Sequence, residues 1–594
     1  MTYSRPPVHT SRPQLEGSFG FASSTHWLAT GAAQAMLERG GNAFDAVVAG
    51  GFVLHVVEPH LNGPGGDLVG LFRPAGSQAP RVLMGQGPAP AAATIAHFRA
   101  EGLDLVPGAG GLAAAVPAAV DAWLVLLRDH GTMSLADVLA PAIDYARDGH
   151  PLLPAAAATV ARVSELFLDH WTSSAHLWMP GGRLPQPGEV VRNPEYADVL
   201  DALVGAEAAA PDRGAGIDAA RSRWRALLAT AAGFLALPHR HSGGTDHAAV
   251  ISAADIAGFA AGYEDPVTAT FRGHTVVKAG AWTQGPALLQ ALRLLEPLSD
   301  EALDPATERG AHTIIETLKL SLADRDAHFG DGVDPAPLLD DDYLDGRRRL
   351  LGDRASHVWR PGSPDGIRPF APPLVRDATG ASGTGEPTVS VSGTTRGDTC
   401  HIDVVDRWGN LVSVTPSGGW LQSSPAVPGL GFCLGTRLQM CWLDDASPAA
   451  LRPGKRPRTT LSPTLVVRDD GTAMALGTPG GDQQDQWQLP MILRMIVGGY
   501  SAQQAIDAPT FHTTAMIDSF WPRTWTPAGV VAESRLDAEV LEGLRRRGHE
   551  ITVSGEWTLG RLCAAGQSPR PGTTAPVLWA AANSRGMSGY AAGR

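Results

Sequence analysis

The sequence predicts an α+β protein, with helices and hairpins of strands in separate stretches of one chain. Helical apolar patterns dominate up to residue 328, whereas strand alternation becomes strong after residue 399. Two hairpins are expected there, over 399–415 and 464–476. The chain has 594 residues, of which 44% are hydrophobic and 18% charged. This composition suffices for a large buried core and excludes wholesale disorder.

Helix boundaries follow from capping signals. Gly40-Gly41 closes the first apolar pattern, and Asn42 opens the second. Residues 204–245, rich in Ala, Arg and Gly, indicate an insertion or a mobile helical segment, and residues 1–16 an extended arm. Apolar periodicity predicts helices at 23–39, 42–57, 112–146 (as two helices around His130-Gly131), 310–328, 483–497 and 536–547.

Strands and long loops alternate with these helices. A glycine loop over 58–67 precedes a predicted buried strand at 68–72. Residues 353–397 are rich in Pro, Gly, Ser and Thr and show almost no apolar periodicity. A loop of that length in a compact protein is either disordered or functional.

Composition narrows the classes of protein that the chain can represent. A formal net charge of −13 argues against a general nucleic-acid binder. Residues 1–20 lack the apolar core of a signal peptide, and no apolar run reaches 18 residues. We therefore expect a cytoplasmic protein without a membrane partner. The cysteines show no zinc-type spacing, so neither a metal nor a cofactor is implied; they lie at 400, 433, 441 and 563.

One candidate nucleophile lies where the long loop meets a strand, in Asp398-Thr399-Cys400-His401. The common phosphate-loop, zinc-protease and G-x-S-x-G motifs are absent. A Thr hydroxyl needs a base, and its own α-amine can serve once the preceding peptide bond is cut. The plain alternative is a β-branched residue that begins a strand. Strand alternation places Cys400 on the face opposite Thr399, and His401 on the same face as Thr399.

Six stretches carry a resemblance to a known family, in the family's order. Together they are similar to the gamma-glutamyltransferase (gamma-glutamyltranspeptidase) family of N-terminal-nucleophile hydrolases. They are 40–49 with Val57-Glu-Pro-His60 and Gly63-Pro-Gly-Gly66; Val116-Pro117 with 139–143; Ala323-Asp-Arg325 with Gly330-Asp331; 398–406 with Gly409-Asn410; Pro457-Arg-Thr-Thr-Leu-Ser-Pro463; and Gly477-Thr-Pro-Gly-Gly481 with 505–509.

The resemblance implies a four-layer αββα sandwich and a proenzyme that cuts itself between Asp398 and Thr399. Residues 1–398 would form the large subunit, with 353–398 as its processing loop. Residues 399–594 would form the small catalytic subunit, and the two would remain one folded unit. Its substrate would be a small-molecule amide or a peptide.

The resemblance also assigns roles within the site. Thr399 would attack an amide carbonyl, and the acyl-enzyme would pass to water or to an amine. Gly480 and Gly481 match the loop whose N–H groups stabilise the oxyanion. Ser417 lies where the family has a hydroxyl that orients the nucleophile. Two further hydroxyl residues match contacts to the substrate carboxylate, Thr459 and Thr460.

The substrate clamp departs from the family pattern. Gln86 stands where the family has an arginine, and an amide cannot replace the charged fork that a carboxylate prefers. Gln439 and Trp442 stand where acidic residues are expected. These changes resemble the divergent branch with oxamate amidohydrolase-like and acylase-like members. Trp420 and Asp482 are further candidates for lining the substrate pocket.

Three functions remain open from the sequence. The first is a self-processing amide hydrolase or acyltransferase of this family, with action on a non-glutamyl amide as its alternative form. The second keeps gamma-glutamyl transfer, with another residue replacing the missing arginine. The third is an unprocessed relative that binds a ligand without catalysis.

Overall fold

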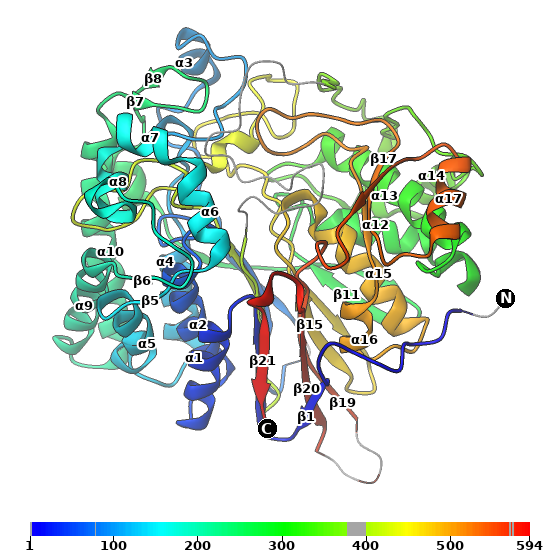
Figure 1. Ribbon diagram of the computed structural model, residues 1–594, viewed down its shortest axis with the longest axis horizontal. Coiled ribbons are helices and arrows are strands. Elements are labelled where there is room, and N and C mark those ends of the chain that lie inside the picture. The colour runs from blue at the N-terminus through cyan, green and yellow to red at the C-terminus, as the bar shows by residue number, and fades with distance from the viewer. Residues whose placement is uncertain (1–2, 78, 377–398, 570–571, 573–574) are drawn as a thin grey trace.

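Two antiparallel seven-stranded sheets lie face to face, with helices on both outer faces (Figure 1). The computed structural model describes residues 3–77, 79–376, 399–569, 572 and 575–594. The β12 sheet runs in the order β21 (Tyr590–Gly593), β2 (Gly20–Ser24), β12 (Ile402–Asp406), β13 (Leu411–Ser417), β3 (Asp67–Arg73), β4 (Arg81–Gly85), β9 (Gly262–Glu264). The β15 sheet runs in the order β1 (Leu15–Gly17), β20 (Val577–Ala582), β19 (Cys563–Ser568), β15 (Ala473–Gly477), β14 (Thr464–Val467), β11 (His274–Lys278), β10 (Val267–Phe271).

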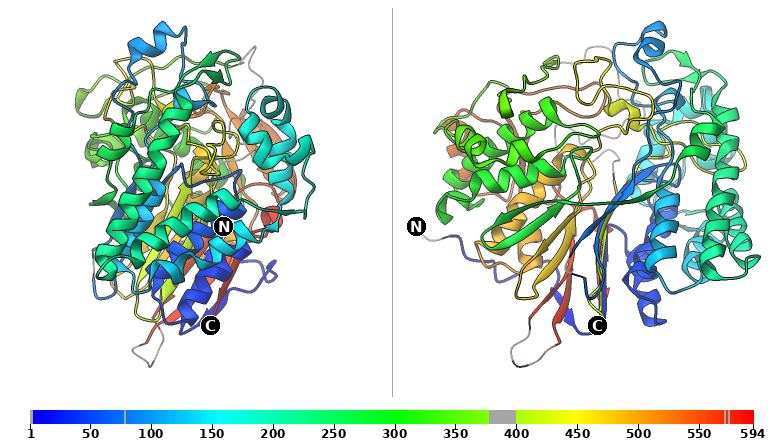
Figure 2. Two further views of the ribbon diagram at one scale, coloured as in Figure 1. Left: turned by 90° about the vertical axis from the view of Figure 1, so that its left-hand side faces the viewer. Right: turned by 180° about the vertical axis from the view of Figure 1, so that it is seen from behind.

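Helices cover the two outer faces. Those over the β12 sheet are α1 (Trp27–Glu38), α2 (Ala43–Val57), α4 (Ala119–His130), α5 (Leu135–Arg147), α9 (Pro194–Ala208) and α10 (Arg213–Leu235). Those over the β15 sheet are α12 (Gly285–Leu295), α13 (Glu308–His328), α15 (Gln484–Ile496), α16 (Ala502–Asp507) and α17 (Ala538–Arg546). The back view in Figure 2 shows both sheets between the two helical layers. The predicted αββα sandwich is therefore confirmed.

Three apolar layers hold the sandwich together, as strand alternation requires. On β12, Ile402 and Val404 pack under the helices, whereas Val405 packs between the sheets. The inter-sheet layer also contains Leu465 of β14 and Ala475 of β15. Burying one face of a strand against helices and the other against the second sheet explains why β14 and β15 carry no charged residue.

Local signals explain most of the element boundaries. The Asn42 side chain accepts hydrogen bonds from the N–H groups of Phe44 and Asp45, and Asp45 bonds back to the N–H of Asn42. This capping box begins α2 at the predicted residue. The predicted helix at 23–39 begins later, at Trp27, because residues up to Ser24 belong to β2. Residues 114–118 likewise precede α4 without helical structure.

The segment 204–245 packs as part of the helical layer. It contains the end of α9 and all of α10. Trp224 of α10 is only 1% exposed and stacks on Phe432, with ring centroids 5.4 Å apart. The expectation of helical structure here is confirmed, and α10 packs against the core of the helical layer.

Shorter elements complete the fold. They are α3 (Ile95–Ala100), α6 (Pro154–Arg162), α7 (Ser164–Asp169), α8 (Thr172–Trp178), α11 (Ala253–Gly258), α14 (Asp341–Arg348), β5 (His150–Pro151), β6 (Val190–Val191), β7 (His239–Arg240), β8 (Asp246–His247), β16 (Phe511–Thr513), β17 (Gly529–Glu533) and β18 (Glu550–Ser554). Of the predicted long loop, 353–376 is irregular apart from a short turn at 364–366, and 377–398 lies outside the described residues. None of the described helices is both long and apolar enough to cross a membrane.

Candidate active site

Thr399 and Ser417 face each other where two central strands meet. They form an antiparallel bridge that extends the β12–β13 pairing, and Cys400 N donates to the Pro416 carbonyl at 3.0 Å. Thr399 Oγ1 and Ser417 Oγ lie 3.2 Å apart, and both residues are buried. Because both side chains stand on paired backbone, their hydroxyl groups are held in a fixed relative position.

Glycines pack directly against the backbone beside Ser417. A Cβ on Gly66 would lie 2.1 Å from the Ser417 carbonyl oxygen, and a Cβ on Gly63 would lie 2.3 Å from that of Gly419. Only residues without side chains allow this approach. The glycine loop of the sequence therefore supports the strand end that carries Ser417.

His401 lies between the two sheets: it hydrogen-bonds within the β12 sheet and packs against Gly477 of the β15 sheet. Its Nδ1 lies 2.9 Å from Thr415 Oγ1, and its Nε2 lies 2.9 Å from Asp403 Oδ1. A Cβ on Gly477 at the end of β15 would lie 2.2 Å from the imidazole. Both ring nitrogens have protein partners, so His401 anchors the strand and is not placed as a base for Thr399.

Cys400 points away from Thr399, into the helical layer. Its Sγ donates to Glu58 Oε2 at 3.0 Å, and Thr25 Oγ1 donates to the same oxygen at 2.6 Å. Burial raises the pKa of both Cys400 and Glu58. Thr25 N also donates to the His401 carbonyl at 3.1 Å. A buried thiol of raised pKa is a poor nucleophile, so the prediction that Cys400 serves packing agrees with its surroundings.

The loop after β15 presents two backbone amides. Gly480 has φ +126°, and a Cβ there would lie 2.2 Å from the Trp487 ring. Gly481 O accepts from Gln284 Nε2 at 3.2 Å, and Gly480 O accepts from Gln483 N at 2.9 Å. Within the described part of the chain, the N–H groups of Gly480 and Gly481 donate to no partner. Backbone N–H groups without a protein partner are one requirement of an oxyanion-binding loop.

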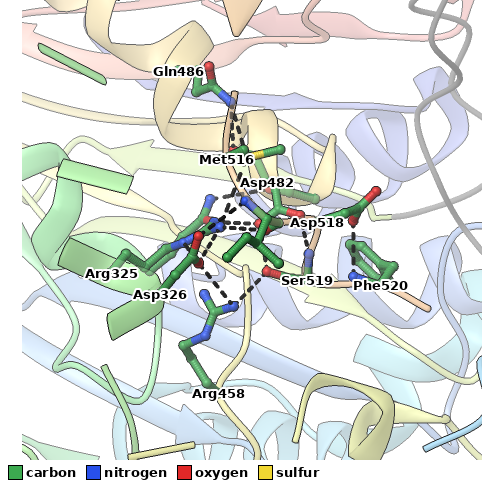
Figure 3. Close-up of polar contacts among 12 residues, drawn as sticks. Arg325, Asp326, Arg458, Asp482, Gln486, Met516, Asp518, Ser519 and Phe520 are labelled. Carbon is green, nitrogen blue, oxygen red and sulfur yellow. Dashed lines mark hydrogen bonds and ion pairs between the residues drawn. The ribbon is translucent and has the colours of Figure 1, made fainter. Parts of the chain in front are cut away.

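A buried ionic cluster follows this loop (Figure 3). Asp482 pairs with Arg325 Nη1 and accepts from Ser519 N at 2.8 Å and Ser519 Oγ at 2.6 Å. Arg325 Nη2 lies 2.8 Å from Asp326 Oδ1. Arg458 Nη2 donates to Ser519 Oγ at 2.7 Å, while Arg458 Nη1 is buried without a partner among the described residues. Asp482, a predicted substrate contact, is thus bonded to protein groups.

Three other predicted substrate contacts are buried. Gln86 Nε2 donates to the Gly87 carbonyl at 3.1 Å, and its Oε1 has no partner in the described structure. Thr459 N donates to the Trp282 carbonyl at 2.8 Å. Thr460 Oγ1 is buried and has no hydrogen-bond partner within the described residues. Gln86 also borders an open pocket of about 650 Å³.

The remaining predicted contacts converge on segment 519–521. Trp420 packs on Phe520, Trp521 N donates to Gln439 Oε1 at 3.3 Å, and Asp482 binds Ser519 as above. Sequence reasoning missed this segment because it carries no local motif. Arg325 and Arg458 both lie in stretches that resemble the family, but the sequence assigns neither of them a role. Among the described residues, no group of three His, Cys, Asp or Glu side chains is placed to hold a metal ion.

An αββα sandwich with a hydroxyl residue at the start of a central strand defines the class of N-terminal-nucleophile hydrolases. The family profile described as Gamma-glutamyltranspeptidase matches residues 29–593. The chain therefore belongs to the gamma-glutamyltranspeptidase family. It is an enzyme of the kind that hydrolyses amides or transfers their acyl groups.

Two curated relatives cover nearly the whole chain. The glutathione hydrolase-like YwrD proenzyme of Bacillus subtilis (strain 168) is 30% identical over 541 residues, 90% of this chain and 91% of that protein. The oxamate amidohydrolase proenzyme of Klebsiella pneumoniae is 30% identical over 550 residues, 91% of this chain and 92% of that protein. The predicted likeness to the divergent branch is confirmed.

Solved structures agree with the fold. The structure of LmbA2991HD is 51% identical, with a TM-score of 0.92 over 99% of this chain and 100% of that one. The cephalosporin acylase from Bacillus halodurans is 27% identical, with a TM-score of 0.81 over 99% of this chain and 98% of that one. Both likenesses extend across both sheets and their helical layers.

Proposed function

We propose that the chain cuts its own Asp398–Thr399 bond and then uses Thr399 as the nucleophile of an amide hydrolase. The observation that carries this proposal is the 3.2 Å contact between the buried hydroxyl groups of Thr399 and Ser417. Asp398 lies outside the described residues. Support comes from the relatives, two of which are named as proenzymes. Residues 1–398 and 399–594 would be the two subunits after the cut.

The chemistry needs no group beyond the chain and a water molecule. The freed α-amine of Thr399 takes the proton of Oγ1, which attacks the amide carbonyl. The N–H groups of Gly480 and Gly481 stabilise the oxyanion, and Ser417 orients the attacking hydroxyl. The C–N bond then breaks, and the amine leaves with the proton. Water attacks the resulting ester, which releases the acid and restores Thr399.

The substrate that we propose is a small amide other than a gamma-glutamyl compound. Gln86 is neutral and already donates to the Gly87 carbonyl, so it offers no charged fork for a glutamyl carboxylate. Gln439 and Trp442 replace the acids that would bind an α-amine. Oxamate amidohydrolase and cephalosporin acylase, to which the chain is similar, are named for amide hydrolysis.

Gamma-glutamyl transfer is the second candidate, because YwrD is described as glutathione hydrolase-like. Release of a chromogenic amine from a gamma-glutamyl anilide measures cleavage of the gamma-glutamyl amide, and a faster release with an added acceptor amine measures transfer. A processed enzyme that hydrolyses oxamate but leaves the anilide intact favours the first candidate. The reverse result favours the second.

Purified protein tests the nucleophile. We expect wild type to yield two fragments, the smaller beginning at Thr399 by mass spectrometry, and Thr399→Ala to stay a single chain of 62.1 kDa. Thr399→Ser should process and retain reduced activity. Thr313→Ala, at a Thr whose hydroxyl bonds within its own helix, is the control. A wild-type chain that stays intact, with a specific ligand bound, would support the non-catalytic relative instead.

A further inference from the structure

The oxyanion loop is held by two side chains from the helical layer over the β15 sheet. Gln284, at the N-terminus of α12, donates through Nε2 to the Gly481 carbonyl at 3.2 Å. Arg325, on α13, donates through Nη1 to Gln284 Oε1 at 2.9 Å. The arginine thereby fixes which way the glutamine amide points, because a guanidinium has only donors.

Arg325 also forms an ion pair with Asp482, the residue that follows the loop. Its Nη1 pairs with Asp482, next in sequence after Gly481. Its other nitrogen atoms contact Asp326 Oδ1, at 3.0 and 2.8 Å, and Arg325 Nη2 donates to the Ile517 carbonyl at 3.2 Å. Arg325 is fully buried, so these bonds lie in a low-dielectric environment.

The charges of this cluster favour a permanent ion pair. Burial alone would raise the pKa of Asp482, but Arg325 and Arg458 lower it below its ordinary value. Burial and the neighbouring Asp482 raise the pKa of Asp518 well above the ordinary value. Asp518 therefore binds its proton more tightly than Asp482 does.

We propose that Arg325 and Gln284 are positioning residues that aim the N–H groups of Gly480 and Gly481 at the acyl oxygen on Thr399. This inference rests on the proposed function. Gln284 turns the Gly481 carbonyl away from the nucleophile, and Arg325 keeps Gln284 and Asp482 in place. Without Arg325, the amide can rotate and present its oxygen to the Gly481 carbonyl, and that repulsion displaces the loop.

Trp487 provides a readout that does not need activity. Its ring contacts Gly480 so closely that a Cβ there would lie 2.2 Å away. In protein labelled with 5-fluorotryptophan, the Trp487 resonance is assigned with Trp487→Phe. We expect Arg325→Met and Gln284→Met to shift this resonance. Arg347→Met, at a buried arginine paired with Asp324, is the matched control and should leave it in place.

Kinetics separate positioning from general stability. Losing one oxyanion donor slows catalysis about a hundredfold or more, so kcat of Gln284→Met should fall by about ten- to a hundredfold with KM unchanged. Arg325→Lys, which keeps the charge but not the fork, should lie between wild type and Arg325→Met. If Arg325→Met does not fold, Gln284→Met still tests the inference, because this substitution leaves the ion pair between Arg325 and Asp482 intact.

Two results would overturn the inference. One is a Trp487 resonance that stays in place in Gln284→Met, and the other is a rise in KM at constant kcat. An enzyme that hydrolyses no amide in any form would refute the proposed function instead, while the fluorine spectra would still report whether the loop is held.

Discussion

Thr399 and Cys400 are neighbours in sequence but lie in different environments. The pleat places the Thr399 hydroxyl beside Ser417, whereas the Cys400 thiol bonds to Glu58 under the helices. The Thr399 hydroxyl is therefore placed where it can act as a nucleophile, whereas the thiol of the next residue, Cys400, is buried and unreactive. A one-residue shift of β12 would exchange the two side chains and bring the thiol to the proposed site.

Arg458 is the residue from which we expect substrate selectivity. Its Nη1 is buried without a partner in the described structure, and burial together with Arg325 lowers its pKa to about 10. It remains charged at neutral pH. Its Nη2 lies 3.9 Å from Asp326 Oδ1, so Nη1 is the part of the guanidinium that still lacks a hydrogen bond, which is costly for a buried polar group. We therefore expect it to bind an acidic group of the substrate.

Substrate pairs measure this selectivity. Arg458→Met should lower kcat/KM for amic acids such as oxamate or succinamate by about ten- to a hundredfold, the usual strength of a hydrogen bond to a charged group. The matching neutral diamides should be unaffected, and Arg458→Lys should restore part of the preference. Arg452→Met, at an exposed arginine, is the control. Equal losses for acids and diamides would contradict this role.

At the scale of the element, the turn between β15 and α15 depends on Gly480. An alanine there would need φ +126° and would place its Cβ 2.2 Å from the Trp487 ring. We expect Gly480→Ala to cost about 1–3 kcal/mol of unfolding free energy and at least about a hundredfold in kcat. Gly499→Ala, at φ +67° with nothing within 4 Å, is the matched control for backbone strain alone. Similar kinetics in the two variants would count against the loop's proposed role.

The end of α2 carries a pH-dependent contact. Burial raises the pKa of Glu58 above its ordinary 4.5, so the folded protein binds this proton more tightly than the unfolded chain. The resulting stability is present below pH 4.5 and is lost as pH rises through the folded pKa. Glu58→Gln cannot ionise and should lose less stability than wild type between pH 5 and pH 8.

Urea unfolding at both pH values measures the Glu58 effect. Glu165→Gln, at an exposed position on α7, should follow wild type. An identical pH dependence in wild type and Glu58→Gln would show that Glu58 is not the group responsible.

Elements with local signals could be predicted, and contacts between distant segments could not. The capping residue Asn42 predicts the start of α2, and the turn residues Asp469-Asp-Gly471 predict the hairpin β14–β15. The predicted helix at 23–39 includes the last two residues of β2, Ser23 and Ser24, because the pairing of β2 with β12 joins segments about 380 residues apart and leaves no local pattern. The convergence of Trp420, Gln439 and Asp482 on 519–521 depends on tertiary packing in the same way.

At the scale of the whole molecule, both sheets mix strands from either side of residue 399. β12 and β13 lie between β2 and β3, and the block of β20, β19, β15 and β14 lies between β1 and β11. Separating the two proposed subunits would therefore break strand pairing in both sheets.

This interleaving predicts that processing leaves the hydrodynamic size unchanged. Fragments 1–398 and 399–594 should elute together in size-exclusion chromatography and separate only in denaturant. Thr399→Ala, as the uncut reference, should elute at the same volume. Two peaks from processed protein without denaturant would contradict the interleaved arrangement.

The same interleaving sets the order of events in the life of the chain. While β12 is tethered to β2 by one polypeptide, strand insertion is an intramolecular search, with a loop-closure cost that grows only slowly with length. Two separate pieces would instead have to meet at a rate that depends on their concentration, each with unpaired sheet edges prone to aggregation. Folding therefore has to precede the cleavage that we propose, because only the intact chain brings the strands of both proposed subunits together in one folding unit.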